Sequence, residues 1–310
     1  MKRALSAKAA STAERGGSFC GRGRGFGPVL RLLLSAGLLP AAAIATPASV
    51  AAEPVPSRVV SINLCTDQLA MLMATPGQLQ SVSFLASEKG TSMMVEEAAR
   101  YPLNHGQAEE IFLMQPDLVL AGTFTAKATV DLLQKLGFRV EEFAPAASFD
   151  DVRADLIRMG ALLGRQQRAA AMVAELDHGL AELAARKVPA MNAAFYYANS
   201  YTSGSGTLAD AIVKAAGLTN LGEALGFKGM VRLPLELLVS ADPDLIIEGD
   251  SQYSAPALAK ENFVHPAFKA LSSRVVAIAD KYTICGAPFT LEASRILQRA
   301  ALGQDGARHE

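Results

Sequence analysis

The sequence has few charged residues, few histidines, few cysteines and no tryptophan. Only 19% of its 310 residues are charged, whereas 50% are hydrophobic. A chain this apolar can bury a core, which excludes an intrinsically disordered protein. Its length is that of one or two globular domains.

Histidine is too scarce for a typical free-metal site, which needs several His and carboxylate side chains converging on one ion. His178 falls in a long helical pattern, His309 is terminal, and no loop is rich in histidine; the remaining two are His105 and His265. Binding of a free zinc or manganese ion therefore stays only an alternative.

Sequence signatures of the common enzyme classes are also missing. The chain contains no nucleophile elbow, no phosphate loop with its lysine, no dinucleotide glycine fingerprint and no metallohydrolase helix. We do not expect an enzyme, and a secreted α/β enzyme is the second alternative.

The basic residues are concentrated at the N-terminus. Residues 1–52 carry seven basic side chains and one acidic one, so the formal net charge of −1 for the whole chain becomes about −7 for the remainder. An acidic body repels phosphate, which excludes a nucleic-acid partner.

The same N-terminal segment has the form of a secretory signal peptide. A basic region is followed by the apolar run at residues 29–39 and by a small-residue tail, so cleavage is expected near Ala51 or Ala52. The alternative is an uncleaved membrane anchor at residues 32–52, although its alanines and two prolines make a poor spanning helix. We expect an exported, periplasmic protein.

From residue 58 onward, short apolar runs alternate with helical patterns, as is typical of parallel α/β proteins. Expected strands are residues 58–62, 81–84, 118–121, 139–143, 193–197, 245–247 and 274–278. Expected helices are residues 67–74, 126–136, 207–216 and 289–302.

Residues 149–187 break this alternation, because they contain no Pro and place apolar side chains at helical spacing. They are expected to form one long helix or two helices with a break near Gly164. The expected fold is α/β: two doubly wound α/β lobes joined by a long linker helix, with a ligand cleft between the lobes. The predicted boundaries are a signal peptide (1–52), an N-terminal lobe (53–147), the linker helix (148–188) and a C-terminal lobe (189–310).

An internal repeat supports two related lobes. Residues 109–120 align with residues 236–247 at a separation of 127 residues, and both segments have Glu, six residues, Pro-Asp-Leu and then apolar residues. In each, a short helix is expected to end before the Pro, because Pro disfavours helix in the preceding residue, and a buried strand to follow the Asp.

These segments resemble the periplasmic substrate-binding proteins of ABC importers for iron-siderophores, haem and cobalamin. The resemblance implies two lobes with a rigid helical linker, little closure on binding, and delivery of cargo to an inner-membrane permease by a monomeric protein without a cofactor. The cargo would be a small-molecule metal complex: an iron complex (siderophore or haem) or cobalamin, with the choice left open. The similar segments, in order, are Arg58–Leu69, Gln115–Leu120, Leu136–Val140, Ser203–Asp210, Ala216–Asn220, Glu236–Ile247, His265–Phe268 and Arg274–Ile278.

The resemblance also implies that one glutamate on each lobe docks onto arginine pockets of the permease. By motif position these are Glu109 and Glu236, with Glu110 as the alternative on the first lobe. Charge-assisted contacts with Arg would fix the orientation of docking. The other interpretation is an ordinary solvated acid favoured by the helix dipole.

Ligands of doubly wound sheets face the loops that follow the carboxyl ends of the strands. Most of these loops carry one aromatic residue, and flat aromatic faces suit a planar or aryl ligand. Arg232 could pair with ligand carboxylates or an anionic chelate, or be a surface residue. The candidate ligand-binding residues are Cys65, Phe84, Phe124, Tyr201, Arg232, Tyr253, Tyr282 and Cys285.

Cys65 and Cys285 are the two cysteines beyond the leader, one in each lobe. An oxidising compartment favours a disulfide, which would tie the lobes together across the ligand site and needs Cα atoms within about 7 Å. Buried inert thiols and thiols that contact cargo are the other interpretations, and the residues alone leave all three open.

Overall fold

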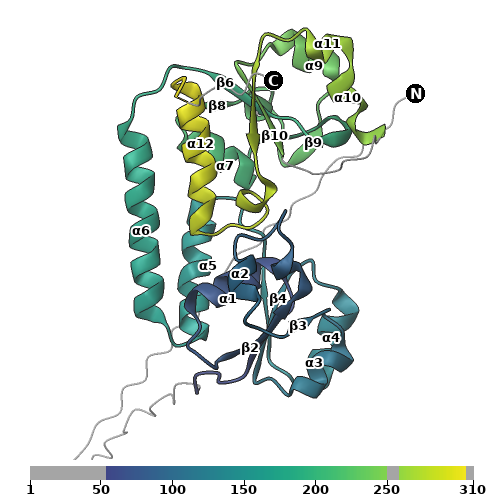
Figure 1. Ribbon diagram of the computed structural model, residues 1–310, viewed down its shortest axis with the longest axis vertical. Coiled ribbons are helices and arrows are strands. Elements are labelled where there is room, and N and C mark those ends of the chain that lie inside the picture. Colours follow the sequence, from purple (N-terminus) through teal and green to yellow (C-terminus); the bar gives the residue numbers. More distant parts are fainter. Residues whose placement is uncertain (1–53, 250–257, 305–310) are drawn as a thin grey trace, which may run out of the picture. The chain divides into compact units, whose positions relative to one another are not determined.

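The apolar runs of the N-terminal half form a parallel sheet. The computed structural model describes residues 54–249 and 258–304 (Figure 1). The strand order of this sheet is β3-β2-β1-β4-β5. Its strands are β1 (Val59–Ser61), β2 (Leu79–Ser83), β3 (Leu103–Asn104), β4 (Leu118–Gly122) and β5 (Val140–Phe143), with helices α1 (Leu64–Met73), α2 (Val95–Ala98), α3 (Ala108–Met114) and α4 (Lys127–Lys135) between them.

The C-terminal half forms a second parallel sheet in the order β11-β10-β6-β8, and β7 and β9 form an antiparallel pair. The strands are β6 (Asn192–Phe195), β7 (Tyr201–Ser203), β8 (Thr219–Asn220), β9 (Met230–Arg232), β10 (Leu245–Gly249) and β11 (Arg274–Ile278). The helices are α7 (Leu208–Ala215), α8 (Leu221–Ala224), α9 (Leu235–Ala241), α10 (Glu261–Val264), α11 (Pro266–Lys269) and α12 (Leu291–Ala301).

Two helices, α5 (Phe149–Leu162) and α6 (Gln166–Ala185), connect the two sheets and lie side by side (Figure 1). Ser148 caps α5 by accepting a hydrogen bond from the backbone N–H of Asp151 at 3.1 Å. Gly164, between the helices, has a φ of 68°, which favours glycine. The alternative of two helices with a break near Gly164 is confirmed, and a single long linker helix is wrong.

Alternate residues of the central strands face two different cores, as expected for strands covered on both faces. In β4, Leu118 and Leu120 belong to one core and Val119 and Ala121 to another. The first core is continuous from the N-terminal sheet through α5, α6 and α12 to the C-terminal sheet. A shared helical layer therefore joins the two lobes.

The sequence repeat is also a structural repeat. Helices α3 and α9, and strands β4 and β10, begin and end at positions that correspond across the separation of 127 residues. Each helix ends at a residue with left-handed backbone, Gln115 (φ 47°) or Asp242 (φ 40°), directly before the Pro. Both lobes therefore use the same helix-to-strand connection.

Several predicted boundaries shift. Helix α1 begins at Leu64, three residues before the expected start, because the Asn63 side chain accepts a hydrogen bond from Cys65 N at 3.0 Å and caps it. Strand β2 ends before Phe84, which opens a short 3-10 turn. Strands β3, β7, β8 and β9 were not predicted, because two or three residues are too few to show alternation. The predicted signal peptide lies outside the described residues, and the exact lobe boundaries stay predictions.

Candidate functional site

In the N-terminal lobe a small cavity lies where β1, β4 and β5 end. Its volume is about 60 Å³. Residue 122 must be glycine for Asn63 to pack against it, because a Cβ at this position would lie only 2.7 Å from Nδ2 of Asn63. Asp155 is the cavity's one charged lining residue, and partial burial raises the pKa of this carboxyl to about 6. We call this cavity the N-lobe pocket; its lining includes Asn63, Cys65, Thr66, Gly122, Phe124, Phe143, Asp155 and Gly286.

In the C-terminal lobe a larger cavity of about 340 Å³ lies where β6, β10 and β11 end. Burial raises the pKa of Glu248, against the opposing effect of Lys260. Burial also raises the pKa of Tyr197 to about 12, so this phenol stays neutral. We call this cavity the C-lobe pocket; it is lined by Tyr196, Tyr197, Ala198, Glu248, Gly249, Lys260, Phe263 and Asp280.

Of the predicted aromatic residues that the structure describes, Phe124 lines the N-lobe pocket, whereas Phe84, Tyr201 and Tyr282 line neither pocket. Phe124 is 86% exposed at the N-lobe pocket, which leaves its ring free to stack on a ligand. Phe84 is 39% exposed and stacks on His105, with ring centroids 5.4 Å apart. The Lys281 ammonium group lies 5.6 Å from the ring centroid of Tyr282. Tyr253 lies outside the described residues.

Arg232 and Tyr201 lie on the antiparallel pair β7–β9, so the expectation that Tyr201 belongs to a loop is wrong. The Arg232 guanidinium lies 5.8 Å from the Tyr201 ring centroid. Arg232 lines a separate depression of about 480 Å³ together with Glu236 and Glu261, and it is not among the residues that line the C-lobe pocket.

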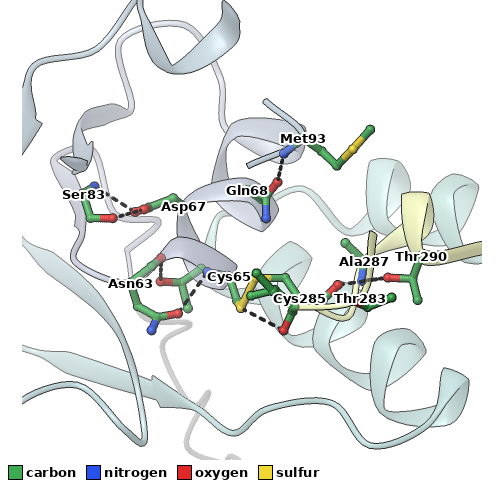
Figure 2. The surroundings of a disulfide bond; sticks show 12 residues. Asn63, Cys65, Asp67, Gln68, Ser83, Met93, Thr283, Cys285, Ala287 and Thr290 are labelled. Atoms are coloured by element: carbon green, nitrogen blue, oxygen red, sulfur yellow. Dashed lines mark hydrogen bonds between the residues drawn. A yellow bond between two sulfur atoms is a disulfide. The ribbon is translucent and has the colours of Figure 1, made fainter. Parts of the chain in front are cut away.

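Cys65 and Cys285 form a disulfide, so both free-thiol interpretations are wrong. Their Cα atoms are 5.1 Å apart although 220 residues separate them in the sequence. Figure 2 shows Cys65 in the first turn of α1, rather than in the expected loop, and Cys285 opposite it. Cys65 still lines the N-lobe pocket, whereas Cys285 is only 1% exposed and does not offer a surface to cargo.

The predicted docking glutamates occupy equivalent places in the two lobes. Glu109 and Glu236 are exposed in the first turns of α3 and α9. Glu110 instead accepts a hydrogen bond from the backbone N–H of His105 at 2.8 Å. The structural repeat therefore favours Glu109 over Glu110, and the docking role stays a prediction.

The histidines are dispersed. His105 lies 3.7 Å from Glu110, His178 lies 3.3 Å from Glu182 on α6, and the His265 side chain accepts a hydrogen bond that caps α11. His309 lies outside the described residues. Within residues 54–249 and 258–304, no three His, Cys, Asp or Glu side chains are grouped closely enough to hold a metal ion.

The pocket residues that the sequence analysis does not predict include Asp155, Tyr197, Glu248, Lys260 and Asp280. Glu248 directly follows the apolar run of β10, so its position at a strand end was a usable signal. Asp155 lies on α5, in the segment assigned to the linker, and only tertiary packing brings it to the N-lobe pocket.

The family model for periplasmic binding proteins matches residues 62–271. The chain therefore belongs to the periplasmic binding protein family. Within the part of the chain that the structure describes, no helix combines the length and apolarity needed to cross a bilayer.

Among relatives, a cobalamin-binding protein of Halobacterium salinarum is 28% identical over 202 residues, which is 63% of this chain and 54% of that protein. The chain thus spans about half the length of the curated relatives it matches.

Among solved structures, the apo periplasmic haem-binding protein RhuT from Roseiflexus sp. RS-1 superposes with a TM-score of 0.65 at 20% identity, over 80% of this chain and 98% of that chain. The periplasmic vitamin B12-binding protein BtuF of Vibrio cholerae gives 0.61 at 14% identity, over 82% and 99%. Both likenesses show the shared two-lobed fold.

Proposed function

We propose that the protein is the periplasmic solute-binding component of an ABC importer and that its cargo is a corrinoid of the cobalamin type. Family membership and the cobalamin-binding relative support the solute-binding role. The two pockets at the carboxyl ends of parallel strands are the places where this fold binds ligands.

The choice of a corrinoid as cargo rests on the charges of the residues that line the pockets. The lining residues of the two pockets include three carboxylates and one cation. The carboxylates are Asp155 in the N-lobe pocket and Glu248 and Asp280 in the C-lobe pocket, and the cation is Lys260. This excess of carboxylates opposes the propionates of haem and the charge of an anionic ferric chelate. It suits the peripheral amides of a corrin ring, which donate hydrogen bonds to carboxylates.

The side chains that could ligate the metal of the cargo also favour a corrinoid over haem. A haem iron is held by His, Cys, Met or Tyr from the protein. Of these types the lining residues of the two pockets offer Cys65, which is disulfide-bonded, and Tyr196 and Tyr197, which are buried or kept neutral. A corrinoid brings axial ligands of its own and needs none of them.

Delivery would use the two exposed glutamates. Glu109 and Glu236 stand in the first turns of equivalent helices, so each lobe presents one carboxylate to a membrane partner. Arginines of a permease would pair with them by charge-assisted hydrogen bonds. The acidic chain beyond the leader is consistent with a basic partner surface.

The cargo is tested by titrating the secreted protein with cyanocobalamin, haemin and a ferric catecholate in a calorimeter. Tight binding of cyanocobalamin alone is expected. Glu248→Gln keeps the shape but removes the charge, so it should weaken cyanocobalamin binding about fivefold, the difference between a charged and a neutral hydrogen bond.

The matched control is Glu175→Gln, a change of the same type at an exposed position of α6, which should leave affinity unchanged. Binding of haemin or the catecholate in place of cyanocobalamin would refute the corrinoid assignment while leaving the solute-binding role intact.

A further inference from the structure

The disulfide joins the lobes beside the N-lobe pocket, and the segment that carries Cys285 reaches both pockets. Cys65 belongs to α1 in the N-terminal lobe and lines the N-lobe pocket. Cys285 belongs to residues 280–287, the segment that follows β11 in the C-terminal lobe, which we call the clasp segment. Its first residue, Asp280, lines the C-lobe pocket, and Gly286 lines the N-lobe pocket.

The clasp segment packs directly on the N-terminal half. A Cβ on Gly286 would lie 2.4 Å from the Cβ of Ala146 and 3.0 Å from Cγ2 of Val152 on α5. The backbone at this point therefore closes one side of the N-lobe pocket. Withdrawal of the segment would widen this pocket beyond its present volume of about 60 Å³.

On its own side the segment is anchored by Thr290, at the start of α12. The Thr290 hydroxyl donates to the carbonyl of Cys285 at 2.9 Å and accepts from the backbone N–H of Ala287 at 3.2 Å (Figure 2). These two hydrogen bonds tie Cys285 and Ala287 to the start of α12 in the oxidised protein. The sulfur bridge is the covalent link between Cys285 of this segment and Cys65 on α1, and it adds to the packing of Gly286 on Ala146 and Val152.

We propose that the Cys65–Cys285 disulfide is a redox-sensitive clasp for the cargo site. In the oxidised protein it holds the clasp segment across both pockets in the geometry that binds cargo; in the reduced protein the segment moves away and affinity falls. The identity of the cargo rests on the proposed function.

The reduction is an ordinary thiol–disulfide exchange with a dithiol. A thiolate of the dithiol attacks Sγ of the half-buried Cys65, and Cys285, which is buried, leaves as a thiolate and takes up a proton. The second thiol of the reductant then displaces Cys65, so the dithiol is oxidised to its disulfide and the protein gains two thiols.

A binding-independent measurement tests the clasp first. We compare hydrogen exchange of the backbone amides at residues 280–287 in the cargo-free oxidised protein and in the Cys65→Ser/Cys285→Ser variant. The variant should exchange about tenfold faster in this segment, because local opening is no longer opposed by the bridge, and no faster in β4 or β10. Equal rates in the segment would overturn the clasp.

Cyanocobalamin affinity is measured on the same two proteins. We expect about tenfold weaker binding by the variant, within the usual range for the coupling of two sites. Equal affinity would also overturn the clasp. If neither protein binds cyanocobalamin, the proposed cargo fails, and the exchange rates still decide whether the bridge holds the segment.

The continuous core through α5, α6 and α12 should keep the variant folded. If it does not fold, reduction of the native protein with dithiothreitol followed by alkylation cleaves the same bond without a substitution. The alkylated protein should then show the same faster exchange, and unchanged rates would count against the proposal.

Discussion

Asp67 should make the stability of this protein depend on pH. It is fully buried on α1, where it accepts hydrogen bonds from the backbone N–H and the hydroxyl of Ser83 (Figure 2). Burial raises its pKa from the ordinary value of 3.8 to about 7, although hydrogen bonds from Ser61 and Ser83 work in the opposite direction. The folded protein therefore holds a proton at this carboxyl that the unfolded chain releases.

Because the folded protein holds this proton more tightly than the unfolded chain, its stability falls as the pH rises. The proton contributes its full stability below pH 4, and the contribution is lost as the pH rises through 7. The shift of about three pH units corresponds to about 4 kcal/mol over the whole range, and most of that, about 3 kcal/mol, is lost between pH 5 and 8.

The perturbation is Asp67→Asn, which keeps an acceptor for the Ser83 N–H and removes the titration. Free energies of unfolding are measured in urea at pH 5, 6, 7 and 8 for both proteins. The wild type should lose about 3 kcal/mol more than the variant between pH 5 and pH 8, and other groups such as Asp155 cancel in the comparison. Parallel pH profiles would refute the reasoning.

Three further changes have expected outcomes. Replacing Cys65 and Cys285 by Ser should lower the free energy of unfolding, by about 5 kcal/mol if the chain-entropy relation holds for 220 residues of separation, as measured in guanidinium chloride. Gly222→Ala would place a Cβ 2.4 Å from a backbone oxygen of β7, so it should cost about 2 kcal/mol by thermal unfolding. Lysine at Glu109 and Glu236 together should abolish uptake by cells and leave cargo affinity unchanged.

Matched control substitutions separate these effects from a non-specific loss of stability or binding. Gly90→Ala meets nothing within 4 Å and has no left-handed φ, so it should be neutral where Gly222→Ala is not. Lysine at Glu175 is the control for the docking pair. A double-serine variant as stable as the wild type, a neutral Gly222→Ala, or lost cargo affinity in the lysine pair would each contradict the corresponding argument.

Most of the fold was visible in the sequence because its signals are local. The apolar runs of β1, β4 and β10 are buried on both faces and stand out without tertiary information. The repeat around Glu109 and Glu236 was equally readable, because the Pro-Asp-Leu that follows each short helix marks the turn into a strand. Helix α1 begins earlier than the apolar spacing predicts because Asn63 caps its first turn.

The site was less predictable because tertiary packing builds it. The Cys65–Cys285 pairing depends on two segments that meet only in the folded chain, and composition left it open. Arg232 was grouped with the cleft residues, yet the β7–β9 pair carries it to a separate depression. A strand of three residues shows no alternation, so the sequence predicts a loop at Tyr201 where the structure has β7.

The central claim is that the protein binds a corrinoid that contacts the two strand-end pockets. The most direct measurement is the absorbance spectrum of the protein isolated from the periplasm and then titrated with cyanocobalamin. We predict a saturable spectral change, with one corrinoid bound per chain and weaker binding in Glu248→Gln. The absence of any change with cyanocobalamin, together with a saturable change on adding haemin or a ferric siderophore, would contradict the account.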